Sequence, residues 1–180
     1  MTTTTPSSHG HGVQSVAPPV TIAVVGASGN TGRMYQAPEL ISCKGFIGLR
    51  HLNHVLQEPL CRLGAIVDVA PAGAELAKRH RCPIYTTIPE MMTAIHSGQL
   101  KVDGAILATP TASHVPLGLL LVEAGVHVII EKPLSVDTAS GKELVAAATA
   151  SGAQILVGHH RRFNPHMREV LQYLPESATG

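Results

Sequence analysis

Residues 20–32 read VTIAVVGASGNTG and join a strand pattern to a turn rich in glycine. The β-branched run over residues 20–25 is short and apolar, which is typical of a buried strand. The turn that follows contains three glycines, Gly26, Gly29 and Gly32. Residues 31–41 then show helical spacing. Because a glycine turn between a strand and a helix lets the backbone approach a phosphate group, this stretch predicts the start of an α/β fold with an anion-binding turn.

The rest of the chain alternates between strand and helix patterns. Apolar runs predict strands at 65–69, 83–86, 102–108, 126–130 and 154–157. Helical spacing predicts helices at 72–80, 89–96, 114–124 and 136–150. Strands of Val, Ile and Leu that alternate with helices are typical of a parallel sheet covered on both faces. The predicted fold class is therefore α/β, with the doubly wound parallel sheet of a Rossmann fold.

Length and composition limit the domain organisation. The chain has 180 residues, a length that allows one domain. Of these residues 44% are hydrophobic and 14% are charged, so the composition allows a buried core. Residues 1–19 are rich in Thr, Ser, His and Pro, and we expect them to form a disordered tail. Residues 20–159 form the predicted domain. Residues 42–62 fit none of its elements, and an insertion is one interpretation of them.

Charge and cysteine content exclude several classes of function. There are 13 basic and 12 acidic side chains, so the net charge of +1 argues against a nucleic-acid partner. The apolar runs fall short of the roughly 18 residues that a membrane span needs. The three cysteines, Cys43, Cys61 and Cys82, form no Cys-x-x-Cys pair. We therefore expect no membrane contact, no metal site and a reducing, cytoplasmic location.

The ligand of an open α/β sheet binds at the carboxyl ends of its strands. We expect the first turn to hold the diphosphate of a dinucleotide. The candidate residues are Gly26, Ser28, Gly29, Asn30, Thr31 and Gly32. The spacing has one extra residue between the first two glycines, so a glycine-rich turn without a ligand is the alternative.

An acidic residue at the end of the second strand is expected to bind the adenine ribose, and Asp68 is the candidate. Asp68 lies farther from the glycines than the usual spacing of roughly 20 residues, and residues 42–62 account for the excess. A helix-capping or solvent-facing role is the alternative. If Asp68 faces the ribose, it repels a 2′-phosphate, so NAD is slightly favoured over NADP.

Three later strands end in polar motifs. These read ATPTASH at 108–114, EKP at 131–133 and GHHRRFNP at 158–165. A lysine directly after a strand, such as Lys132, can point into the ligand crevice and exchange a proton with a substrate hydroxyl. A surface ion pair with Glu131 is the alternative for that motif, and a helix cap is the alternative for the first motif.

Together these motifs resemble the N-terminal half of the Gfo/Idh/MocA oxidoreductase family, which includes inositol and glucose dehydrogenases. The resemblance implies a domain that binds NAD or NADP and transfers hydride between the cofactor and a hydroxyl of a sugar, polyol or related metabolite. It implies that Lys132 is the catalytic residue. The residues that it implies for cofactor binding are Thr109, Pro110, Thr111, His114, Glu131, Lys132, Pro133 and Arg161.

Members of that family continue into a second α/β domain, so residues 160–180 are expected to be its truncated start. The chain is then an incomplete oxidoreductase that binds cofactor, and a non-catalytic dinucleotide-binding regulatory module is the alternative. Short-chain reductases fit less well, because no tyrosine has a lysine four positions later. Apolar residues around Phe163, Met167 and Leu171 predict self-association.

Overall fold

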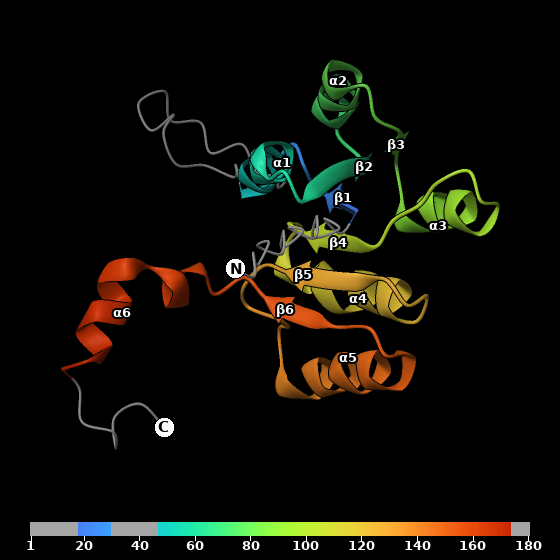
Figure 1. The fold of residues 1–180 in the computed structure, drawn as a ribbon. Coiled ribbons are helices and arrows are strands. Elements are labelled where there is room, and N and C mark those ends of the chain that lie inside the picture. Colours follow the sequence, from blue (N-terminus) through green and yellow to red (C-terminus); the bar gives the residue numbers. More distant parts are fainter. Residues whose placement is uncertain (1–17, 30–46, 174–180) are drawn as a thin grey trace, which may run out of the picture.

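The computed structural model describes residues 18–29 and 47–173, and its core is one six-stranded parallel sheet. The strands are β1 (Val20–Val25), β2 (Cys61–Val67), β3 (Ile84–Tyr85), β4 (Gly104–Leu107), β5 (His127–Ile130) and β6 (Ile155–Val157). Their order is β3-β2-β1-β4-β5-β6, so the winding reverses between β1 and β4 (Figure 1). This is the doubly wound order of a Rossmann fold, and it confirms the predicted fold class.

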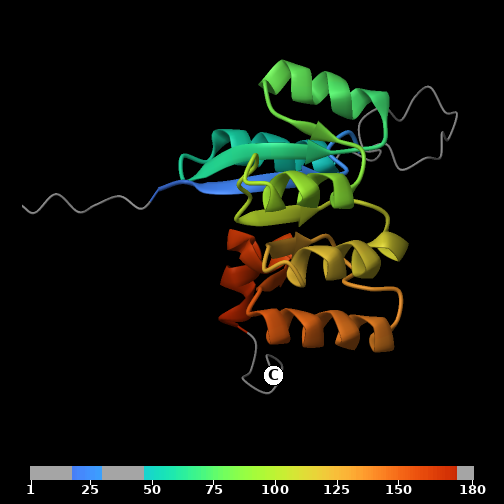
Figure 2. The same cartoon turned by 90° about the vertical axis from the view of Figure 1, so that its right-hand side faces the viewer.

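Helices cover both faces of the sheet. The covering helices are α1 (Ile47–Gln57), α2 (Pro71–His80), α3 (Ile88–His96), α4 (His114–Val122) and α5 (Thr138–Ser151), and a further helix, α6 (Pro165–Leu171), follows β6. Figure 2 views the face covered by α3, α4 and α5. Side chains alternate along β1, so that Ala23 and Val25 join the core beneath these helices while Val24 joins the core beneath α1 and α2. The two cores keep the sheet rigid beneath its carboxyl edge.

The register of the sheet brings the strand ends level with one another. The paired residues in one row across the sheet are Tyr85, Val67, Val25, Leu107, Ile130 and Val157. The residue after each strand therefore stands at the same edge. In sheet order these residues are Thr86, Asp68, Gly26, Ala108, Glu131 and Gly158. The sequence motifs thus meet along a single line.

Residues 47–62 are the described part of the segment 42–62, and they belong to the α/β fold itself, whereas an insertion was one interpretation of that segment. From Ile47 onward it forms α1, which connects β1 to β2 and buries Leu52 and Val55, and Cys61 begins β2. The helix was not predicted because Gly, Pro and His residues interrupt the apolar spacing in this part of the sequence. The helix expected at 31–41 and the tail expected at 1–19 lie outside the described residues, apart from the first positions before β1.

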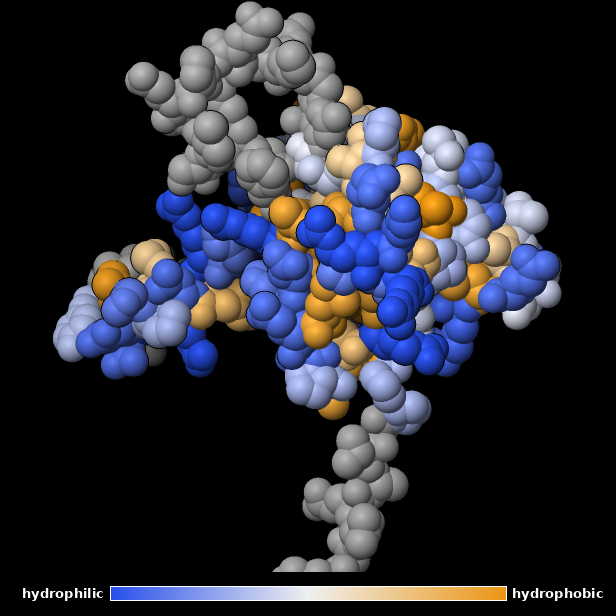
Figure 3. All heavy atoms as spheres, turned by 90° about the horizontal axis from the view of Figure 1, so that it is seen from above, coloured by the Kyte–Doolittle hydropathy of each residue, from blue (hydrophilic) through white to orange (hydrophobic). Residues whose placement is uncertain are grey.

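The last helix is attached differently from the others. None of the residues of α6 is buried, and Figures 1 and 3 show α6 projecting from the body of the molecule. Met167 and Leu171 on α6 and Phe163 before it are exposed. Across residues 18–29 and 47–173, no helix is long and apolar enough to cross a membrane.

Candidate functional site

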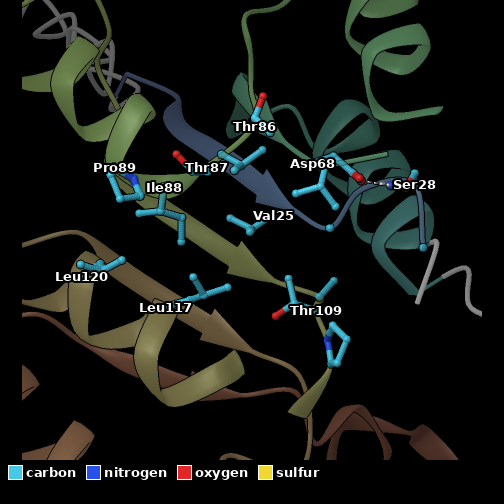
Figure 4. Close-up of a pocket in the computed structure, with 16 residues that line it drawn as sticks. Val25, Ser28, Asp68, Thr86, Thr87, Ile88, Pro89, Thr109, Leu117 and Leu120 are labelled. Carbon is cyan, nitrogen blue, oxygen red and sulfur yellow. Dashed lines mark hydrogen bonds between the residues drawn. The ribbon is translucent and has the colours of Figure 1, made fainter. Parts of the chain in front are cut away.

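A cavity of about 460 Å³ lies at the carboxyl edge, beside the point where the strand order reverses. The glycine turn after β1, the end of β2, the start of α3, the end of β4 and α4 line it. Figure 4 shows apolar side chains of α3 and α4, among them Ile88, Leu117 and Leu120, on one side of this cavity. Asp68 and Ser28 lie on the opposite side. The cavity therefore pairs an apolar wall with a polar rim.

The glycine turn needs its first glycine for two reasons. Gly26 has a φ of 79°, in the left-handed region, and a Cβ there would lie 2.8 Å from the carbonyl oxygen of Ala108. Gly29 also has a positive φ and lines the cavity. The other residues expected in this turn, Asn30, Thr31 and Gly32, lie outside the described part of the chain.

One further glycine packs against the turn, and it was not predicted from the sequence. Gly48, near the start of α1, is so close to Gly26 that a Cβ would stand 2.0 Å from the Gly26 carbonyl oxygen. This is the role of the third glycine in dinucleotide-binding turns, which lets the helix pack tightly on the strand. A spacing signal could have revealed it. Counted from Gly48, the acidic Asp68 follows after about 20 residues, the usual distance.

Asp68 joins the end of β2 to the glycine turn. The Ser28 amide donates to Asp68 Oδ2 over 2.7 Å, and the Ala70 amide donates to Oδ1 over 2.9 Å. Each carboxylate oxygen has a further lone pair for another donor, such as a ribose hydroxyl. The loop after β1 and the loop after β2 are thus held together at the cavity rim, with a carboxylate beside the glycine turn.

The motif after β4 divides between the cavity and the core. Thr109 and Pro110 line the cavity, whereas Thr111 begins a short 3₁₀ turn. His114 is 1% exposed and does not line the cavity. Its Nδ1 lies 2.8 Å from the carbonyl oxygen of Pro133, and its Nε2 lies 2.9 Å from that of Thr109. His114 therefore ties the loop after β4 to the loop after β5 from beneath.

The motif after β5 contains a buried carboxylate. Glu131 is 8% exposed, and its Oε1 lies 2.8 Å from His51 Nε2 on α1. Its Oε2 accepts a hydrogen bond of 3.2 Å from the backbone amide of Lys132. Glu131 is thus paired with a histidine rather than with the neighbouring lysine side chain.

A second, smaller cavity of about 140 Å³ gathers the basic residues. It is lined by Lys132, Gly158, His159, His160, Arg161 and Arg162. The structure therefore brings the candidate catalytic Lys132 together with Arg161, although neither lines the larger cavity. Ligands that span the two cavities would cross the ends of β1, β4 and β5.

A family model described as the oxidoreductase family with an NAD-binding Rossmann fold matches residues 20–159. The chain belongs to the Gfo/Idh/MocA family. This confirms the resemblance drawn from the three polar motifs. Relatives of this family include UDP-N-acetylglucosamine 3-dehydrogenase of Acidithiobacillus ferrooxidans, 27% identical over 140 residues. Inositol 2-dehydrogenase of Rhizobium meliloti is 29% identical over 137 residues.

These Gfo/Idh/MocA relatives are much longer than the region that matches. Each alignment covers 76% of this chain but only 41% or 40% of the relative. Among solved structures of the fold, GenD2 from gentamicin A biosynthesis, in complex with NAD, is 26% identical with a TM-score of 0.63. That likeness covers 87% of this chain and 37% of GenD2. The chain thus spans about two fifths of the length of such Gfo/Idh/MocA proteins.

Proposed function

We propose that this chain binds NAD along the carboxyl edge of its sheet and is the cofactor-binding part of a dehydrogenase that acts on a hydroxyl of a sugar or polyol. The observation that carries the proposal is the contact between the Ser28 amide and Asp68. It sets a carboxylate for a ribose beside a glycine turn for a diphosphate, at the switch point of the sheet.

The residues at this edge fit a dinucleotide. The turn and α1 approach each other through Gly26 and Gly48, whose missing side chains leave the backbone open to a diphosphate. The apolar wall formed by Ile88, Leu117 and Leu120 suits a flat adenine ring. Asp68 would accept hydrogen bonds from the adenine ribose and repel a 2′-phosphate, which favours NAD over NADP.

The nicotinamide half is then assigned to the ends of β4, β5 and β6. Bound NAD would supply the hydride acceptor. Thr109 and Pro110 would flank the cofactor between the two cavities, and Lys132 would orient the substrate hydroxyl and exchange its proton. Glu131, Pro133 and Arg161 would border this half. Thr111 and His114 support the same loops, His114 through the carbonyl oxygens of Thr109 and Pro133.

The relatives supply the substrate class, since the names of two of them specify a UDP-sugar and an inositol. We also propose a cytoplasmic location, where the free thiols of Cys61 and Cys82 would stay reduced.

Isothermal titration with NAD, NADH, NADP and NADPH tests the cofactor assignment. We expect heat on binding for NAD and NADH and weaker binding for the phosphorylated pair. Flat traces for all four on folded protein would overturn the proposal.

Replacing Lys132 with Ala should leave NADH binding nearly intact and abolish hydride transfer to or from myo-inositol or UDP-N-acetylglucosamine. Binding without any turnover in the parent chain would favour a regulatory module.

A further inference from the structure

The contact between His51 and Glu131 crosses the middle of the carboxyl edge. His51 comes from α1, which follows β1, and Glu131 follows β5, with β4 between these two strands. The Nε2 and Oε1 atoms are 2.8 Å apart, and the two side chains are only 19% and 11% exposed. A carboxylate oxygen accepts but does not donate, so Nε2 donates this hydrogen bond.

Glu131 is held on three sides. His51 approaches Oε1, the Lys132 amide donates to Oε2, and on the third side the space beside Gly158 is too narrow for a side chain. A Cβ at Gly158 would stand 3.1 Å from Glu131 Oε1, closer than an ordinary contact. Within the described part of the chain, His51 is the one side chain that the structure pairs with this carboxylate. The carboxylate therefore has one orientation, which the imidazole selects.

We propose that His51 is a positioning residue for the nicotinamide half of the site, acting through Glu131 on the backbone of Lys132. The inference rests on the proposed function. The path has two steps, from His51 Nε2 to Glu131 Oε1 and from Glu131 Oε2 to the Lys132 amide. Without His51, a nearly buried carboxylate loses its side-chain donor, and such a group turns or draws in water to regain one. The turn that presents Lys132 then loses its support.

The effect should be confined to one half of the cofactor. The larger cavity, assigned to the adenosine half, is lined by neither His51 nor Glu131. The smaller cavity is lined by Lys132, whose amide donates to Glu131, and by Gly158, where a Cβ would stand 3.1 Å from Glu131 Oε1. Loss of His51 should therefore weaken contacts to nicotinamide and spare contacts to adenosine and diphosphate.

The test compares NADH with ADP-ribose, which lacks the nicotinamide ring, by calorimetric titration of the 180-residue chain. For His51→Leu we expect roughly tenfold weaker NADH binding, the effect of one lost hydrogen bond to a charged group, and unchanged ADP-ribose binding. His51→Gln should restore most of the NADH affinity, because its amide nitrogen can donate in place of Nε2. His96→Leu is the matched control, an exposed histidine in the last turn of α3, and should leave both affinities unchanged.

Each outcome distinguishes the two proposals. Parent-like NADH affinity in His51→Leu, or equal losses for NADH and ADP-ribose, would overturn the role of His51 while the cofactor assignment stands. If the parent chain binds neither ligand, the proposed function fails and the role of His51 fails with it. Retained ADP-ribose binding also shows that a variant is folded, so an NADH-specific loss cannot come from unfolding.

Discussion

Replacing Gly48 with Ala tests how closely α1 packs on the glycine turn. The new Cβ would start 2.0 Å from the Gly26 carbonyl oxygen, and ordinary contact begins near 3.4 Å, so α1 or the turn must move by about 1.4 Å. The Cβ position is fixed by the backbone of α1, and the Gly26 oxygen is itself a backbone atom, so no side-chain rotation can relieve the clash. A shift of this size would displace the turn that we assign to the diphosphate.

The expected cost follows from two opposing effects. Overpacking costs about 1–3 kcal/mol, and replacing Gly by Ala in a helix returns about 1 kcal/mol, so we expect a net loss near 2 kcal/mol at the severe end of the range. For a chain of this size that lowers Tm by roughly 4–8 °C. NADH affinity should fall by roughly tenfold, the effect of one lost hydrogen bond between the displaced turn and the charged diphosphate.

Thermal unfolding followed by circular dichroism, together with NADH titration, measures both effects. Gly118→Ala on α4 is the matched control, since a Cβ there meets the end of the flexible Leu144 side chain at 3.1 Å rather than backbone. It should change Tm little and NADH affinity not at all. A Gly48→Ala protein as stable as its parent, with full NADH affinity, would refute the packing argument.

Three further predictions concern charge and surface. Asp68→Asn removes the negative charge at the proposed ribose site. The preference for NADH over NADPH, measured by titration, should therefore fall by roughly tenfold. A parent protein that binds NADPH more tightly than NADH would contradict this prediction. The hydrogen bond from the Thr21 amide, 2.8 Å long, holds the pKa of Asp103 below its ordinary value of 3.8. Its stabilising effect should be complete above that value and disappear as pH falls through the lowered pKa. Urea unfolding should therefore show Asp103→Asn less stable than the parent at neutral pH, with the gap closing as pH falls below 3.8. Three apolar side chains at the carboxyl end are exposed, Phe163 by 69%, Met167 by 49% and Leu171 by 46%. Light scattering should therefore detect self-association of the parent chain, and Phe163→Ser should reduce it. A monodisperse parent monomer would count against this prediction.

Sequence patterns predicted most of the elements because they depend on neighbours in the chain. The strand predicted at 126–130 is β5 (His127–Ile130), and the helix predicted at 136–150 is α5 (Thr138–Ser151). Asp137 caps α5 by accepting a hydrogen bond from the Ser140 amide, a local signal. The connection from β1 to β2 was harder to predict, because Gly, Pro and His residues interrupt the apolar spacing over residues 42–62.

The candidate site was predicted in part for the same reason. Strand ends and turns can be located along the chain, so Gly26, Asp68 and Lys132 could be singled out as residues that follow strands. Their chemical roles stay predictions, which the titrations above test. Gly48 was missed because its importance comes from the approach of α1 to a turn more than 20 residues earlier.

The order of strands and helices and the motifs at the strand ends follow from the amino-acid sequence, because hydrophobic periodicity and turn chemistry act over a few residues. The pairing of His51 with Glu131, the burial of His114 and the closeness of Gly48 to Gly26 depend on how distant segments pack. Those contacts arise when the two hydrophobic cores close on the sheet, and no local pattern specifies which side chains then meet.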